Sequence, residues 1–131
     1  EHYRGVLDDR AHGVFNGKVV VHKGASGTDS AQKNANLLLS DKAEIDAKPE
    51  LVIHHDDVKA AHGCTIGQLD DKQLFYLKSR GISAEEARQM LTFAFADEVL
   101  TGISLPALRR FIEKAAFSKL PFGTDAEAML G

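Results

Sequence analysis

Residues 56–67 read Asp-Asp-Val-Lys-Ala-Ala-His-Gly-Cys-Thr-Ile-Gly. The sequence before this stretch is typical of short strands, and the sequence after it is typical of helices. The stretch also holds the only cysteine, Cys64, two residues after His62. We therefore predict two domains, residues 1–68 and residues 69–131, and we expect any chemistry to lie near the junction between them.

Composition narrows the class of protein. The chain has 131 residues, of which 44% are hydrophobic and 27% are charged, as in an ordinary globular domain or two small ones. A net charge of -3 without a basic cluster argues against nucleic-acid binding. No apolar run approaches the roughly 18 residues that span a bilayer. A single cysteine excludes an internal disulfide and favours a cytoplasmic location. Residue 1 is not Met, so we expect a piece of a longer protein.

The first half predicts short strands of about five residues each. Gly, Asn and Asp separate them, with turns expected at Asn16-Gly17 and at Lys48-Pro49. The polar run from Thr28 to Asn34 is expected to be a loop. The predicted strands are Tyr3 to Leu7, Ala11 to Phe15, Lys18 to His22, Ala35 to Ser40, Ala43 to Ala47, Glu50 to His54 and Val58 to His62.

Two architectures suit these strands. An Asn16-Gly17 hairpin favours a small antiparallel sandwich. The recurrence of brief apolar runs at residues 19–21, 37–39 and 51–53 favours a stacked β-solenoid, in which neighbouring coils cover each strand. The pattern alone leaves both open.

The junction carries the one candidate site. On an extended chain Ala60, His62 and Cys64 share one face. An imidazole beside a thiol can bind a soft metal ion or form an activated nucleophile. The alternative is a strand end with a small buried cysteine and a hydrogen-bonded histidine. No third ligand lies nearby in sequence, so a complete metal site would need another chain. The other histidines are interpreted as surface residues.

The second half predicts three helices. The first runs from Asp70 to Gly81, with Asp70 and Gln73 placed as a capping box. The second starts at the capping box Ser83-Ala84-Glu85-Glu86 and runs to about Thr101. The third runs from Ser104 to about Lys119, with a proline in its first turn. We expect Thr124 to Gly131 to fray.

Apolar residues on the second of these helices indicate either a bundle core or a docking surface. They lie on more than one face of that helix, and a bundle this small cannot cover every face. The third helix also carries apolar residues. The residues are Ala87, Met90, Leu91, Phe93, Ala94, Phe95 and Leu100 on the second helix, and Leu108, Phe111, Ile112 and Ala115 on the third.

Long ordered motifs between Tyr3 and about Val99 resemble the SufB/SufD family of iron–sulfur cluster assembly scaffolds. The run that follows the histidine at position 62 is similar to SufD rather than to SufB. The motifs are Ala11 to Lys18, Asn36 to Leu39, Ala43 to Pro49, Asp56 to Lys59, His62-Gly63, Thr65, Gly67, Asp70-Asp71, Gln73 to Leu77 and Ser79 to Ile82.

The resemblance implies a fold of mainly β plus α type. The chain would supply the C-terminal coils of a right-handed parallel β-helix over residues 1–68, followed by a small helical domain over residues 69–131. It also implies a scaffold rather than an enzyme. The partners would be a SufB-like subunit at the β-helix end and a SufC-like ABC-type ATPase on the helices, as in a SufBCD complex.

The resemblance also implies residue roles. His62 matches the family's cluster-related histidine, and Cys64 is a weaker candidate. The iron–sulfur cluster would be transient and shared with SufB, with none expected on this chain alone. A chain cut at this point would expose strand edges, so we expect it to self-associate as a homodimer. The ATPase dock would comprise Leu77, Arg80, Gly81, Ile82, Met90, Phe93 and Phe95.

Two other functions remain alternatives. A metal- or thiol-dependent enzyme using His62 and Cys64 would need a third orienting group and a pocket, and the sequence points to neither. A carbohydrate-binding solenoid would display rows of aromatic residues, yet the chain has no Trp.

Overall fold

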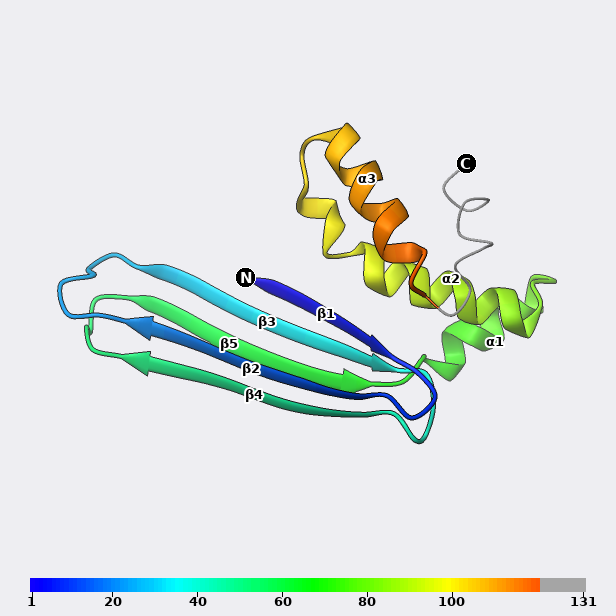
Figure 1. The fold of residues 1–131 in the computed structure, drawn as a ribbon, viewed down its shortest axis with the longest axis horizontal. Coiled ribbons are helices and arrows are strands. Elements are labelled where there is room, and N and C mark those ends of the chain that lie inside the picture. Colours follow the sequence, from blue (N-terminus) through cyan, green and yellow to red (C-terminus); the bar gives the residue numbers. More distant parts are fainter. Residues whose placement is uncertain (121–131) are drawn as a thin grey trace. The chain divides into compact units, whose positions relative to one another are not determined.

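A computed structural model describes residues 1–120, and the chain divides into two compact units between Gln68 and Leu69 (Figure 1). Among residues 1–120, the regular elements of the first unit are strands and those of the second are helices. The expected fraying of Thr124 to Gly131 lies outside the described residues. No helix within residues 1–120 is long and apolar enough to cross a membrane.

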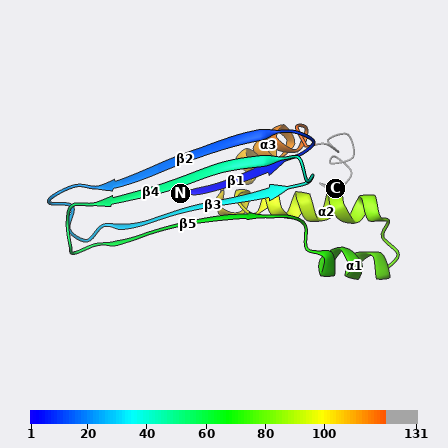
Figure 2. The ribbon, with the colours of Figure 1, turned by 90° about the horizontal axis from the view of Figure 1, so that it is seen from below.

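The strand unit has two parallel sheets, and consecutive strands alternate between them (Figures 1 and 2). One sheet has the order β1-β3-β5, and the other pairs β2 with β4. Every pairing among the described strands is parallel, so the antiparallel sandwich is wrong. The strands are β1 His2–Leu7, β2 His12–Val21, β3 Asp29–Leu38, β4 Glu44–Ile53 and β5 Lys59–Gly67.

Two predicted turns are wrong, because they lie inside long strands. β2 and β4 each have ten residues, and Gly17 pairs with Pro49 in their middle. Gly17 is buried, and a Cβ there would lie 2.7 Å from the Phe15 ring and 2.9 Å from Cδ of Gln32. This glycine therefore marks a close approach between the sheets rather than a turn.

Pro49 fits within β4 because its missing N–H faces away from β2. The backbone N–H groups of Glu44 and His54 donate to carbonyls on the β2 side. Alternate residues of a strand turn their backbone groups to opposite sides, so Pro49 faces the free side of β4. A proline is tolerated there because no ladder hydrogen bond is lost.

The run from Thr28 to Asn34, predicted as a loop, forms most of β3. Its inward side chains are amides, so the run lacks the apolar alternation that marks a half-buried strand. Gln32, Asn34 and Asn36 are only 2–4% exposed. We call these three residues the amide row.

The helical unit forms largely as the local sequence predicts. α1 covers Asp71–Ser79, α2 Ala84–Asp97, the 3-10 turn η1 Leu100–Gly102, and α3 Pro106–Phe117. The Asp70 carboxylate caps α1 by accepting from the N–H of Lys72, and Ser83 with Glu86 forms the expected capping box of α2. Gly81 follows α1 with a φ of 90°, a conformation that glycine adopts readily. α2 ends four residues before the predicted Thr101.

Helix α3 packs on α2 through a different face from the expected apolar one. Phe117 is 1% exposed, and its ring stacks on Phe93 with centroids 4.0 Å apart. Arg109 and Glu113 precede Phe117 at four-residue intervals and share its face. Leu108 and Phe111 are 47% and 72% exposed instead. The polar clamp described below accounts for this orientation.

Candidate functional site

His62 and Cys64 lie on β5, which is an edge strand of its sheet among the described residues. The N–H of Lys59 donates to Thr28 on the β3 side. Because backbone directions alternate, the N–H and C=O groups of His62 and Cys64 face the free edge. Their side chains share one side of the strand, two residues apart.

The register brings both residues beside the amide row. Gln32 pairs with His62, and Asn34 pairs with Cys64. The half-buried Cys64 thiol donates to Asn34 Oδ1 over 3.4 Å, whereas His62 is exposed. Cys64 thus points inward, and His62 is the more accessible of the two.

These two residues alone do not complete a metal site. An imidazole and a thiol suit a soft metal ion, but such ions usually take four protein ligands. Within residues 1–120 no group of three or more His, Cys, Asp or Glu side chains is placed to hold a metal ion. A metal at this edge would therefore need ligands from another molecule.

The predicted dock residues surround the α1–α2 turn and continue along α2. The backbone N–H of Ile82 donates to Leu77 over 3.3 Å, which closes the turn at Gly81. The Arg80 guanidinium donates to the Tyr76 hydroxyl over 3.2 Å and lies 5.2 Å from the centre of its ring.

Along α2 the predicted residues differ in exposure. Met90 is 40% exposed, and Phe95 is half-buried. Phe93 is stacked on Phe117 and contributes to the packing of the unit. Met90 is therefore the most accessible apolar member of this set on α2.

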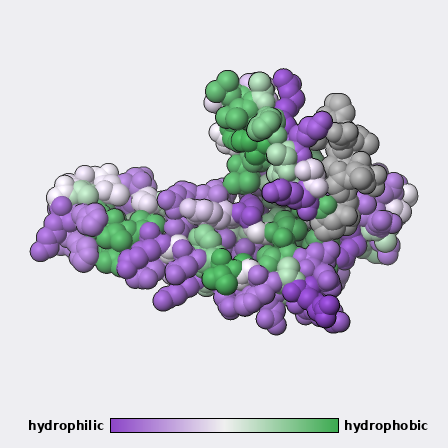
Figure 3. Space-filling view, viewed as in Figure 1, coloured by the Kyte–Doolittle hydropathy of each residue, from purple (hydrophilic) through white to green (hydrophobic). Residues whose placement is uncertain are grey.

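The sequence places Leu108 and Phe111 on the third helix but does not predict that they are exposed. Figure 3 shows hydrophobic residues gathered over α3. Leu105, Leu108 and Phe111 are 47–72% exposed, and Phe75 on α1 is 74% exposed. The three-residue spacing of 105, 108 and 111 was the available signal.

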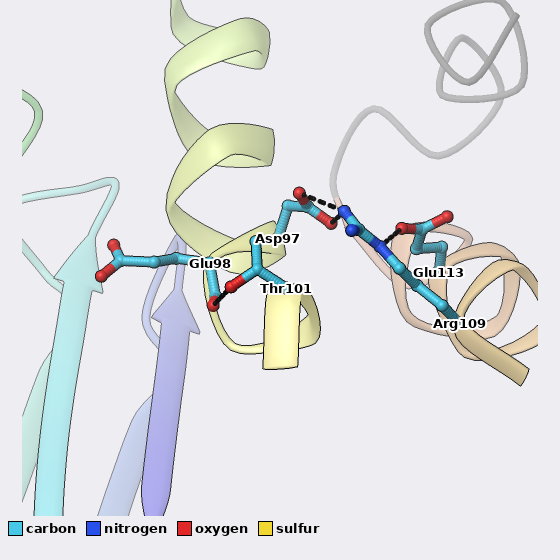
Figure 4. A network of polar contacts seen from close by, with 5 residues as sticks. All are labelled: Asp97, Glu98, Thr101, Arg109 and Glu113. Carbon is cyan, nitrogen blue, oxygen red and sulfur yellow. Dashed lines mark hydrogen bonds and ion pairs between the residues drawn. The ribbon is translucent and has the colours of Figure 1, made fainter. Parts of the chain in front are cut away.

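A polar clamp sets the orientation of α3 (Figure 4). Arg109 Nη2 lies 3.1 and 2.9 Å from the two carboxylate oxygens of Asp97 on α2, and Arg109 Nε lies 2.5 Å from Glu113 Oε1. The hydrogen bond to Glu113 is the main cause of a raised pKa of Arg109. The side chain of Glu113 is only 9% exposed. This clamp holds the charged face of α3 against α2 and turns Leu108 and Phe111 outward.

The fold defines a class of protein with one unit of strands and one of helices. The parallel strands alternate between two sheets, and β5 leaves one strand edge open. Residues 1–95 match the family model described as SUF system FeS cluster assembly, SufBD core domain. The chain belongs to the SufB/SufD family, as the motifs predicted.

Individual relatives agree with this assignment. The iron–sulfur cluster assembly protein SufD of Escherichia coli is 40% identical over 121 residues, which is 92% of this chain and 29% of the relative. A SufBD family protein of Synechocystis is 47% identical over 107 residues, covering 82% of this chain and 24% of its own length. SufD of Bacillus subtilis is 39% identical over 106 residues, 81% of this chain and 24% of that protein. The chain thus spans about a quarter to a third of these relatives.

Proposed function

We propose that this chain is the C-terminal part of a SufD-like, non-enzymatic scaffold for iron–sulfur cluster assembly. The strand unit would form the last coils of a right-handed parallel β-helix. Two observations support this proposal. The strands alternate between two parallel sheets, as successive coils do, and the family match covers residues 1–95.

The SufB-like partner would add a strand to β5 rather than to β4. Every second residue of β5 offers an N–H and a C=O to the free edge, and Ile66 there is 51% exposed. The free edge of β4 carries Pro49 in its middle, which cannot donate a hydrogen bond. This difference between the two edges supports pairing at β5.

The nascent cluster is cargo at this edge, with His62 as the ligand or support from this chain. The observation that carries the proposal is an exposed imidazole on an edge strand, in a unit whose described residues bring no three metal-binding side chains together. A neutral imidazole binds iron, and histidine in place of cysteine raises the cluster potential. The remaining ligands would come from SufB.

The test is cluster formation by the full complex containing His62→Ala, followed by absorbance during reconstitution with iron and sulfide. We expect cluster yield to fall, while His54→Ala, an exposed histidine outside β5, leaves it unchanged. Normal yield with His62→Ala would exclude this role.

The SufC-like ATPase would dock on α2 and the α1–α2 turn. Met90→Asp tests this better than Phe93→Asp, because Met90 is exposed and Phe93 supports the packing of Phe117. We expect Met90→Asp to abolish co-purification with the ATPase. Phe111→Asp is the matched control on α3. If only Phe111→Asp blocks binding, the dock lies on α3.

The alternative remains a metal- or thiol-dependent enzyme that uses His62 and Cys64. The hydrogen bond of Cys64 runs to Asn34, an amide that cannot act as a general base. Rapid alkylation of Cys64 near neutral pH would favour the enzyme. The homodimer and the cytoplasmic location stay predictions.

A further inference from the structure

The exposed side of α3 carries an apolar ridge. Leu105, Leu108 and Phe111 follow one another at three-residue intervals and are 63%, 47% and 72% exposed. Residues three or four apart on a helix are neighbours on its surface, so the exposed Ala115 continues this row. We call these four residues the α3 ridge. It lies on the other side of the helix from Phe117, which is buried against α2.

The charges beside the α3 ridge are all positive. Arg110 and Lys114 are exposed and lie four residues apart along one flank of the ridge, and the exposed Lys119 follows the end of the helix. The one carboxylate between residues 105 and 119 belongs to Glu113, whose side chain is only 9% exposed and is paired with Arg109. The polar clamp thus removes the negative charge from this side of α3 and leaves it apolar and cationic.

An apolar ridge flanked by cations is typical of a helix that lies in the interface of an anionic bilayer. Such a helix places Leu and Phe side chains among the lipid chains, while the long Lys and Arg side chains reach back to the phosphate groups. α3 has 12 residues, so it is long enough to lie on a membrane and too short to cross one.

The same features fit a bilayer better than a protein partner. A protein would need a groove that accepts the ridge and carboxylates placed opposite each of the three cations. A fluid bilayer offers anionic headgroups at any position, with apolar chains directly beneath them. The ridge therefore needs no matched register on a membrane surface.

We propose that α3 binds the surface of membranes that contain anionic phospholipids. The α3 ridge enters the headgroup region, and Arg110, Lys114 and Lys119 lie at the level of the phosphates. Because exposed charges are screened by salt, the contact is reversible and weakens as ionic strength rises. The proposal concerns the helical unit alone and does not depend on the proposed role in cluster assembly.

Co-sedimentation of the whole chain with lipid vesicles tests this proposal. The probe is vesicles of phosphatidylcholine and phosphatidylglycerol in a ratio of about 3 to 1, compared with vesicles of phosphatidylcholine alone. At low salt we expect the anionic vesicles to retain at least about tenfold more protein, and we expect added salt to reduce this retention. Equal retention by both kinds of vesicle, or none by either, would overturn the proposal.

Three variants assign the binding to α3. Phe111→Asp places a carboxylate on the ridge and should lower retention at least about tenfold, and Arg110→Glu should lower it severalfold. Val14→Asp is the matched control, because Val14 is 74% exposed on β2 in the other unit, and its retention should be unchanged. If Phe111→Asp fails to fold by circular dichroism, Arg110→Glu decides. Equal losses in all three variants would mean non-specific adhesion and would overturn the proposal.

An acidic protein surface is the other occupant that an apolar and cationic face could take. If anionic vesicles do not bind the chain and Phe111→Asp loses the ATPase instead, α3 is a protein dock and the membrane proposal is wrong. If vesicles retain Met90→Asp while this variant loses the ATPase, the two surfaces are separate and the proposal stands. Vesicle binding needs no cluster, so normal cluster formation with His62→Ala would reject the proposed function and leave this inference standing.

Discussion

The strand unit hides polar side chains, whereas the helical unit displays apolar ones. Gln32, Asn34 and Asn36 are almost fully buried between the two sheets. On the helices, Phe75 and Phe111 are more than 70% exposed, while the carboxylate of Glu113 is buried against an arginine. The strand unit thus buries polar side chains that are usually exposed, and the helical unit exposes large apolar side chains that are usually buried.

This difference reflects which interactions hold each unit together. In the strand unit, parallel ladders and the hydrogen bond from Cys64 to Asn34 join residues thirty positions apart in register. In the helical unit, a short set of helices buries few large side chains, so apolar side chains such as Phe75 and Phe111 stay exposed. Order in the strand unit therefore comes from pairing between distant residues, whereas order in the helical unit comes mostly from local signals.

Removing the aromatic core of the helical unit should have the largest effect. Phe117→Ala leaves a cavity against Phe93 and should lower the free energy of unfolding of this unit by about 3–5 kcal/mol. Phe111→Ala, on the exposed face, should change it by no more than about 0.5 kcal/mol. Denaturant unfolding measures both, and equal losses would show that Phe111 belongs to the core after all.

The second largest loss of stability is expected when the close approach between the sheets at Gly17 is filled. Gly17→Ala places a methyl group against Phe15 and Gln32 and should destabilise the strand unit by about 1–3 kcal/mol. Gly63→Ala is the matched control, because nothing lies within 4 Å of its added Cβ. Hydrogen exchange should show faster opening in the strand unit only. Loss of protection in α2 as well would mean that the units do not unfold independently.

Opening the polar clamp should have a smaller effect. Arg109→Met leaves the carboxylates of Asp97 and Glu113 without their shared cation, so the helical unit should unfold at a lower temperature. Thermal unfolding followed by circular dichroism measures the difference. An unchanged unfolding temperature would show that the polar clamp does not stabilise the helical unit.

The capping box of α2 should give the smallest effect. Ser83→Ala should cost about 1 kcal/mol, because Ser83 accepts from the N–H of Glu86. The Ser83 side-chain hydrogen bond is the first cause of a lowered pKa of Glu86. A pKa lowered on folding gives a stabilisation that is present above the unfolded value and lost as pH falls through the folded one. Glu86→Gln should remove this part of the pH dependence, as followed by circular dichroism.

The helices and the family could be predicted from the amino-acid order, because their signals are local or are carried by runs of consecutive residues. Asp70, Ser83 and Gly81 act on backbone groups within a few positions of themselves. The spacing of His62 and Cys64 on one side of a strand likewise needs only an extended backbone.

The strand boundaries, the buried amides and the orientation of α3 depend on residues that lie far apart in the chain. Asn16-Gly17 and Lys48-Pro49 resemble turns until the parallel register places them side by side in two strands. The run at 28–34 lacks an apolar pattern because two of its inward residues, Gln32 and Asn34, are amides. Gln32 donates to Glu1, and Asn34 accepts from Asn36 and Cys64. The outward face of α3 follows from one arginine that reaches Asp97 on another helix. Pattern and propensity describe a residue and its near neighbours, whereas register, buried polar pairing and helix orientation arise only when distant segments meet.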